Sequence, residues 1–272
     1  MTRKQSKKLS TKDGIDRLDM SIKLFKKENL TGSVQQLKII KNELQGIKDH
    51  TTLNNAFKVL QTSFVVGFNT TSHRIQCSDF FKKRINKTLK FNVSGLNNRS
   101  LDRAWAKLID QRLQGRSILI QLDKILKRGA KTEQDKAISL SYLYLSTIDG
   151  IYGKNLKDII IWDKLSKIQT VDFDELKKMN MTNIQEYFKE IPKSSCLFDG
   201  WIIDIRNAIG HSSFWYDEKK KKIIYEERRK SRKHEKTINE MYENLVKLSD
   251  VDLLVFYYNE IQVVNKIISD LK

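Results

Sequence analysis

Apolar residues along this chain recur every three or four positions, the spacing that places them on one face of an α-helix. In the first such stretch, residues 14–28, Leu18 and Ile22 are typical members, and Asp13 stands where a helix N-cap is favoured. The segment 133–152 is apolar on more than one face, so we expect it to be buried centrally. The periodicity predicts helices at 14–28, 33–47, 52–68, 72–89, 100–127, 133–152, 154–168, 174–179, 184–191, 197–208 and 236–271.

A different pattern follows the helix predicted at 197–208. Two β-prone runs, 213–216 and 223–225, flank a charged turn, as in a small β-hairpin. Gly210 precedes the first run, where a left-handed residue often ends a helix. One proline and eleven glycines in 272 residues are too few for the many turns of a β-sandwich or barrel. We therefore expect an all-α fold, a multi-helix bundle with a small β-hairpin.

The polar segment 91–99 contains a glycine and is the best candidate for an internal boundary. It separates an N-terminal helical region, residues 13–99, to which the sequence assigns no role, from a helical domain at 100–272. Residues 1–12 carry five basic side chains and no acidic one, which predicts a flexible basic arm.

The charge balance narrows the choice of partners. The chain has 51 Lys and Arg against 33 Asp and Glu, a net charge of +18. Such a charge attracts polyanions, and nucleic acid is the first candidate. A general bias toward Lys, Asn and Ile in the source proteome is the alternative explanation. A second basic cluster at 217–236, with ten basic and five acidic residues, favours nucleic acid because it lies beside the strongest motif.

Several protein classes are excluded by simple counts. No apolar run approaches 18 residues, so a membrane span is not expected. No apolar segment follows the basic N-terminus, which argues against a secretory signal. Two cysteines, Cys77 and Cys196, supply neither a disulfide framework nor a four-cysteine zinc site. We expect a cytoplasmic protein without a metal site or cofactor.

The segment 204–211 ends an apolar helix with a compact polar set: Arg206, Asn207 and His211. A planar, permanently charged guanidinium holds a phosphate through two hydrogen bonds. An imidazole titrates near neutral pH and transfers protons, and an amide orients either group or the substrate. The three suit metal-free cleavage of RNA, in which the 2′-hydroxyl loses a proton, the 5′-oxygen gains one and charge on the phosphate is stabilised.

Two features of this set have structural consequences. One histidine performs only one of the two proton transfers at a time, so we expect a symmetric dimer to bring a second set. Arg206 and His211 are five residues apart, about 140° around an ideal helix, and do not share a face. The helix must therefore end or tighten at Gly210, which permits the turn.

These residues resemble the motif of HEPN domains (higher eukaryotes and prokaryotes nucleotide-binding), whose nuclease members carry Arg, a polar residue, and His after four intervening residues. The segment 139–152 is similar to a central helix of that fold, and the hairpin and closing helix also fit. The resemblance covers residues 100–272. It implies that Arg206 and His211 are catalytic and Asn207 supporting, with Asp149 a weaker carry-over.

The resemblance also implies a helical bundle, usually a homodimer, that is often a metal-independent endoribonuclease. Such nucleases occur in toxin–antitoxin, abortive-infection and CRISPR-linked antiviral defence systems. A nucleotidyltransferase-like antitoxin is a common partner, and tRNA or mRNA is the expected substrate class.

Residues after the motif are candidates for binding RNA. Tyr216, next to Trp215, suits base stacking, and a basic run suits contact with the phosphate backbone. Packing of the aromatic rings within the hairpin and a solvated loop are the alternatives; His234, inside the basic run, is expected to be exposed. The candidate RNA-binding residues are Tyr216, Lys219, Lys220, Arg228, Arg229 and Arg232.

Two functions from different classes remain at this point. The first is a dimeric HEPN-type ribonuclease. The second is a non-catalytic HEPN-like helical adaptor or nucleic-acid-binding protein. A purely structural role for the motif would pair Arg206 with an aspartate and leave His211 as a helix cap.

Overall fold

The computed structural model describes residues 10–27, 29, 31–47, 53–76, 83, 99–167, 169–227 and 232–270. Its contacts divide the chain into two compact units. The first contains Met1–Thr70, Leu89–Leu113 and Phe256–Lys272, and the second contains Thr71–Thr88 and Gln114–Val255. The boundary expected at 91–99 falls almost wholly outside the described residues, so the domains 13–99 and 100–272 stay predictions, as does the arm at 1–12.

The first unit is built on α1 (Thr11–Lys27), α2 (Thr31–Gly46) and most of α3 (Leu53–Arg74). The Lys41 ammonium of α2 lies 2.7 Å from the Asp19 carboxylate of α1. The apolar spacing predicted from sequence forms the core, with these side chains buried: Leu18, Ile22, Leu37, Ile40, Leu44, Phe57, Leu60 and Phe64. The start of the helix expected at 72–89 is wrong, because residues 72–74 are the end of α3 and 75–76 form a turn. Residues 77–82 and 84–90 lie outside the described ranges, so the rest of that prediction is not tested.

The first helix begins earlier than expected, and its cap is Ser10 rather than Asp13. The Ser10 hydroxyl accepts a hydrogen bond from the Asp13 backbone N–H at 3.2 Å. The Asp13 carboxylate accepts one from the Ser10 backbone N–H at 2.7 Å. This reciprocal pair is a capping box and satisfies two backbone N–H groups at the helix start. Asp13 is therefore the third residue of the helix, and its carboxylate bonds back to the N-cap Ser10.

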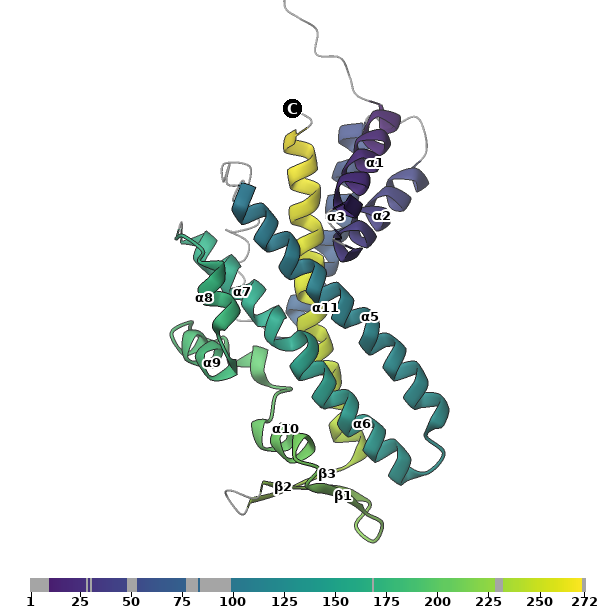
Figure 1. Ribbon diagram of the computed structural model, residues 1–272, viewed down its shortest axis with the longest axis vertical. Coiled ribbons are helices and arrows are strands. Elements are labelled where there is room, and N and C mark those ends of the chain that lie inside the picture. Colours follow the sequence, from purple (N-terminus) through teal and green to yellow (C-terminus); the bar gives the residue numbers. More distant parts are fainter. Residues whose placement is uncertain are drawn as a thin grey trace, which may run out of the picture. The chain divides into compact units, whose positions relative to one another are not determined.

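The second unit is also predominantly helical (Figure 1). Its elements are α5 (Arg99–Gly129) from Gln114 onward, α6 (Glu133–Thr147), the π-helical turn η2 (Ile148–Tyr152), α7 (Gly153–Ser166), α8 (Phe173–Lys178), α9 (Met181–Lys189), the 3-10 turn η3 (Ser195–Phe198), α10 (Ile203–Gly210) and α11 (Ile238–Asp270) up to Val255.

The segment 133–152, expected to be buried centrally, is buried only in part, and α7 is more deeply buried. From Leu156 to Leu165, α7 buries aliphatic side chains and Trp162 almost completely. In α6 one face is buried through Tyr144, whereas Ile138 and Tyr142 are 38% and 41% exposed. Some apolar residues of α6 are therefore in the core and others face solvent, and periodicity alone does not distinguish the two.

A three-stranded antiparallel sheet follows α10 in the order β1-β2-β3. The expected hairpin is formed by β1 (Phe214–Asp217) and β2 (Lys222–Glu227), with Asp217 opposite Lys222. The third strand, β3 (Arg232–Lys236), arises from the basic run. Phe214 stacks on Tyr225, whose hydroxyl lies 2.9 Å from the Ser141 hydroxyl of α6. This face of the sheet thus packs on the helices, with α10 and α6 beside it (Figure 1).

The helix expected at 197–208 is two elements, η3 and α10, separated at residues 199–202. Gly200 packs so closely on α11 that a Cβ there would lie 2.7 Å from the carbonyl oxygen of Asn244. The Tyr144 hydroxyl donates to the Gly200 carbonyl and accepts from the Ile202 backbone N–H, each at 2.9 Å. Burial raises the pKa of Tyr144, so the hydroxyl stays protonated. These contacts satisfy the backbone groups that the break exposes.

The all-α fold with a small β-hairpin is confirmed. Within the residues that the structure describes, no helix combines the length and the apolar character needed to cross a bilayer.

Candidate functional site

The motif segment forms α10 and the turn that ends it. The His211 backbone N–H donates to the Asn207 carbonyl at 2.9 Å. The Ser212 N–H donates to the Ile209 carbonyl at 3.0 Å and the Ser213 N–H to the Ala208 carbonyl at 2.8 Å. This pattern is a Schellman motif. Gly210 is the last helical residue, and Ser212, with φ 53°, takes the left-handed conformation expected at Gly210.

The position of this turn is set by the strand that follows. The Ser213 hydroxyl donates to the Glu226 carbonyl at 2.8 Å, and the Glu226 N–H donates to the Ser213 carbonyl at 2.9 Å. Pairing with β2 therefore begins at Ser213, and the reversal must be complete one residue earlier, at Ser212. His211 lies at the C-cap, exposed, at the junction between α10 and the sheet.

Arg206 is held by Asp149, a residue far away in sequence. Its Nε donates to one carboxylate oxygen of Asp149 at 3.1 Å, and its Nη2 donates to the other at 2.8 Å. Its Nη1 donates to the Asn207 side-chain oxygen at 3.3 Å. The pair is partly exposed, with 38% of the Arg206 side chain and 45% of the Asp149 side chain accessible. The carboxylate occupies one side of the guanidinium and fixes its plane.

The π-helical turn η2 positions Asp149. A π turn adds a residue to the helical register and rotates the side chains that follow it. Gly115 of α5 packs against this turn, since a Cβ there would lie 2.9 Å from the Ile151 Cγ2 and 3.4 Å from the Gly150 carbonyl oxygen. The next residue, Arg116, places its Nε 3.0 Å from the Asp252 carboxylate of α11. The turn therefore packs closely on α5 at Gly115, and the Arg116–Asp252 ion pair joins α5 to α11.

Arg206 and His211 lie at the same end of α10. A Cβ at Gly210 would lie 3.9 Å from Nη1 of Arg206, so the guanidinium extends along the helix toward its C-terminus. Nη1 and Nη2 each retain one N–H that Asp149 and Asn207 do not use. The His211 imidazole makes no hydrogen bond with any residue of the described ranges. The free N–H groups of Arg206 and the exposed His211 are thus both found toward the C-terminal end of α10.

A contact between a histidine and a carboxylate at the start of α10 was not foreseen from the sequence. His234 on β3 places Nε2 3.1 Å from the Asp204 carboxylate in the first turn of α10. Its side chain is 32% exposed, rather than free in solvent as expected for a loop residue. Residues 232–236 carry no apolar–polar alternation that could have indicated a strand, and their density of charge is more typical of a loop. This contact joins β3 to α10.

The candidate RNA-binding residues are distributed over the sheet. Lys219 and Lys220 lie in the turn between β1 and β2, where both backbone N–H groups donate to the Asp217 carboxylate at 3.0 Å. Arg232 begins β3 and is exposed. Arg228 and Arg229 lie outside the described residues.

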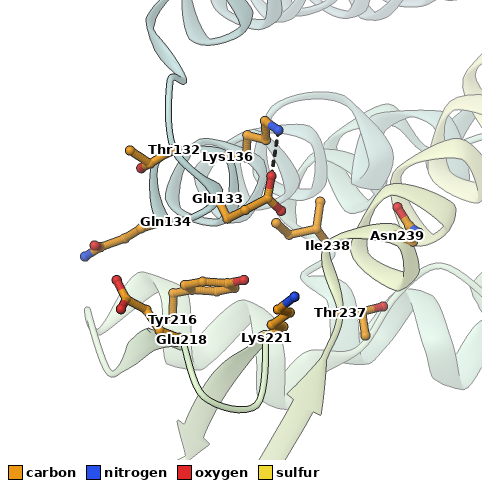
Figure 2. A pocket seen from close by; sticks show the side chains of 10 residues that line it. All are labelled: Thr132, Glu133, Gln134, Lys136, Tyr216, Glu218, Lys221, Thr237, Ile238 and Asn239. Atoms are coloured by element: carbon orange, nitrogen blue, oxygen red, sulfur yellow. Dashed lines mark hydrogen bonds and ion pairs between the residues drawn. The ribbon is translucent and has the colours of Figure 1, made fainter.

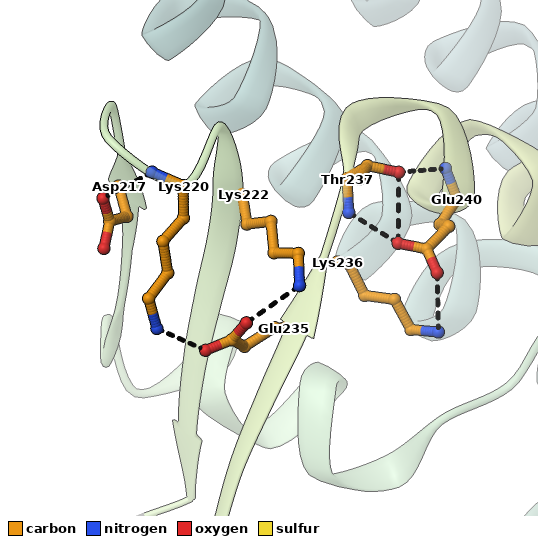
Figure 3. A network of polar contacts seen from close by, with 7 residues as sticks. All are labelled: Asp217, Lys220, Lys222, Glu235, Lys236, Thr237 and Glu240. Carbon is orange, nitrogen blue, oxygen red and sulfur yellow. Dashed lines mark hydrogen bonds and ion pairs between the residues drawn. The ribbon is translucent and has the colours of Figure 1, made fainter.

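One of these lysines is engaged in a network of ion pairs (Figure 3). The Lys220 ammonium lies 2.7 Å from one oxygen of Glu235, and the Lys222 ammonium lies 3.0 Å from the other. Hydrogen bonds from the two lysines lower the pKa of Glu235, and the hydrogen bond between Lys220 and Glu235 raises the pKa of Lys220. Lys219 makes no side-chain ion pair within the described part of the chain, so its charge is available to a ligand.

Tyr216 lines a cavity of about 680 Å³ at the end of the sheet, here called the tip cavity (Figure 2). It lies between the start of α6, the β1–β2 turn and the start of α11, and it includes neither Arg206 nor His211. Its lining residues are Thr132, Glu133, Gln134, Lys136, Tyr216, Glu218, Lys221, Thr237, Ile238 and Asn239.

The described ranges contain no group of three or more His, Cys, Asp or Glu side chains with the spacing to hold a metal ion. No family model, no curated protein and no solved structure matches the chain.

Proposed function

We propose that this protein is a metal-independent endoribonuclease of the HEPN type that belongs to an antiviral defence or toxin–antitoxin system. The observation that carries the proposal is the arrangement of Arg206 and His211 at the C-terminal end of α10. A guanidinium held flat by Asp149, with two N–H groups left over, extends toward the C-terminus of α10, where His211 is the exposed C-cap residue. The net charge of +18 brings a polyanionic substrate to this surface.

The chemistry follows from these groups. His211 of one copy takes the proton of the 2′-hydroxyl, and that oxygen attacks the adjacent phosphorus. The bond from phosphorus to the 5′-oxygen breaks, and the leaving oxygen takes a proton from the His211 of a second copy. Arg206 stabilises the added negative charge on the phosphate oxygens. The products are a 2′,3′-cyclic phosphate and a 5′-hydroxyl end.

The mechanism requires two imidazoles, which supports a homodimer. Each chain presents one exposed imidazole at the end of α10, while the neighbouring His234 is engaged with Asp204. A two-fold axis passing near α10 doubles both Arg206 and His211 around one phosphodiester. A regulatory protein, such as an antitoxin, is the partner class expected to restrain the activity.

A non-catalytic adaptor or RNA-binding protein is the second candidate. It is favoured by the same contacts, because Arg206 is paired with Asp149 and His211 is the C-cap of α10 in a single chain. In that case the motif would stabilise the helix end, and the basic surface would bind RNA without cutting it.

The deciding experiment is incubation of the purified protein with total RNA and with DNA in EDTA. We expect wild type to cleave RNA and to leave cyclic phosphate ends, and we expect Arg206→Ala and His211→Ala to abolish cleavage with unchanged circular dichroism. His73→Ala and Arg128→Ala are the matched controls, since both remove exposed side chains of the same kind elsewhere.

Each outcome has a definite meaning. Loss of wild-type activity on chelation contradicts the metal-free route. Cleavage that His73→Ala and His211→Ala retain equally comes from a contaminating nuclease. Salt-sensitive RNA binding without products, unchanged in His211→Ala, establishes the adaptor.

A further inference from the structure

We propose that the tip cavity binds one nucleobase of the RNA near the cleavage site. This inference rests on the proposed ribonuclease function and adds a recognition site to it. The cavity is formed by three segments that are distant in sequence, α6, the β1–β2 turn and α11, and all three belong to the second unit.

The cavity offers apolar surfaces suited to a flat ring. The Tyr216 ring lies across the cavity, with Ile238 and Glu133 on the opposite side (Figure 2). A planar ligand fits between an aromatic ring and a branched aliphatic side chain, and stacking on an aromatic side chain is available to every base. Trp215, the neighbouring residue on β1, belongs to the opposite face of the strand and does not line the cavity.

The charges of the residues that line the tip cavity favour a nucleobase over a phosphate as the ligand. Glu133 and Glu218 balance Lys136 and Lys221, so the lining is electroneutral in a chain of net charge +18. The Lys136 ammonium already lies 2.6 Å from the Glu133 carboxylate. A neutral group that donates and accepts hydrogen bonds suits such a lining better than an anion does.

The two helix N-termini at the cavity are also unavailable to a phosphate. At the start of α6, Asp135 accepts from the Thr132 N–H at 2.9 Å and the Thr132 hydroxyl accepts from the Asp135 N–H at 3.0 Å. At the start of α11, Glu240 accepts from the Thr237 N–H at 2.7 Å. The chain's own carboxylates therefore occupy the places where an anion would bind.

Hydrogen-bonding groups remain for the edge of a base. Lys221 directs its ammonium into the cavity (Figure 2) and has no ion-pair partner within the described residues. It is a donor for a ring nitrogen or a carbonyl oxygen of a base. Gln134 and Asn239 supply amides at the rim. Phosphates on either side of a bound base would meet the exposed Lys219 of the adjacent turn.

Strand β1 connects the cavity to the motif. His211 and Tyr216 are five residues apart along the chain, so their Cα atoms lie within about 17 Å of one another. A few nucleotides of single-stranded RNA span that distance. A base in the tip cavity would thus set which phosphodiester reaches Arg206 and His211.

The test is binding, measured apart from cleavage. The His211→Ala protein is titrated with each of the four 5′-mononucleotides and with a six-nucleotide RNA, by calorimetry and saturation-transfer NMR. We expect at least one mononucleotide and the RNA to bind and to compete. Tyr216→Ala should weaken both at least about fivefold, whereas Tyr216→Phe, which keeps the ring, should bind as the parent does.

Tyr242→Ala is the matched control, because Tyr242 is exposed on α11 outside the cavity. Ile238→Ala removes the opposite surface without touching the hairpin and should also weaken binding. Equal effects of Tyr216→Ala and Tyr242→Ala, or no mononucleotide binding at all, overturn the proposal. Tight mononucleotide binding without competition by RNA assigns the cavity to a free nucleotide instead. Failure of the ribonuclease proposal is seen separately, as no His211-dependent cleavage by wild type.

Discussion

Arg206 makes its contacts through two different edges of one guanidinium. Nε and Nη2 donate hydrogen bonds to the Asp149 carboxylate on one edge, and the remaining N–H groups of Nη1 and Nη2 point away from Asp149. An arginine carries large rotamer freedom, and a carboxylate that fixes its plane reduces the entropy lost when a phosphate binds. Asp149 is therefore a positioning residue for Arg206.

Replacing Asp149 by Asn should separate binding from cleavage. Asp149→Asn removes a negative charge near the phosphate, so RNA affinity should not fall, but the guanidinium loses its fixed plane. We expect the cleavage rate to drop about ten- to a hundredfold. Single-turnover cleavage and equilibrium RNA binding measure the two effects.

Glu186→Gln is the control for Asp149→Asn, because it removes a carboxylate from an exposed ion pair with Lys189 on α9. Such pairs contribute little, so rate and affinity should both stay unchanged. An Asp149→Asn protein that cleaves RNA as fast as wild type would show that the ion pair has no part in positioning Arg206.

At the scale of the element, η2 is the feature that joins α6 and α7 and carries Asp149. It is a departure from α-helical geometry in the middle of a longer helical segment, and it is held by close packing against Gly115 of α5. Changes at Gly115 should therefore act on Arg206 through η2, without any contact with Arg206 itself.

Gly115→Ala tests this coupling. The new methyl group would meet the buried Ile151 at 2.9 Å, and overpacking of this kind costs about 1–3 kcal/mol. We expect lower stability in urea unfolding and reduced RNA cleavage. Gly129→Ala at the end of the same helix meets nothing within 4 Å, so it should keep or slightly raise stability and leave cleavage unchanged. Equal behaviour of the two variants would contradict the coupling.

Sequence patterns predicted the helices well where the interactions that form them lie within a few residues along the chain. The apolar spacing placed α1, α2, α5, α7 and α11 to within a few residues, because apolar residues at helical spacing mark a helix whether it buries one face or, as α7 does, nearly its whole surface. The predictions from sequence patterns failed where contacts with residues distant in sequence changed the local structure. Tyr144 and the packing of Gly200 divided the helix expected at 197–208, and pairing of Glu226 with Ser213 moved the left-handed residue to Ser212.

On the scale of the whole molecule, the net charge of +18 is the property most relevant to a polyanionic partner. Part of that charge is already neutralised inside the chain. Lys220 and Lys222 share Glu235, whereas Lys219 on the same turn has no such partner in the ranges described. Neighbouring lysines should therefore differ in how many counterions they release on binding RNA.

Salt dependence measures this difference. RNA affinity of the His211→Ala protein should fall linearly with the logarithm of salt concentration. Lys219→Gln should reduce the slope by about 0.7, the value for one phosphate contact on a single strand. Lys220→Gln should reduce it less, because its ammonium is already paired. Identical slopes for the two variants would show that the Glu235 network does not persist with RNA bound.

The sequence by itself determined the helical class, the hairpin and the grouping of Arg206, Asn207 and His211 on one segment. These depend on periodicity and on spacing along the chain, which act over a few residues. Only the tertiary structure decided that Asp149, 57 residues away, holds Arg206, that His234 contacts Asp204, and that three separate segments line the tip cavity. Such contacts are selected by the packing of whole elements, and no local pattern specifies which elements meet.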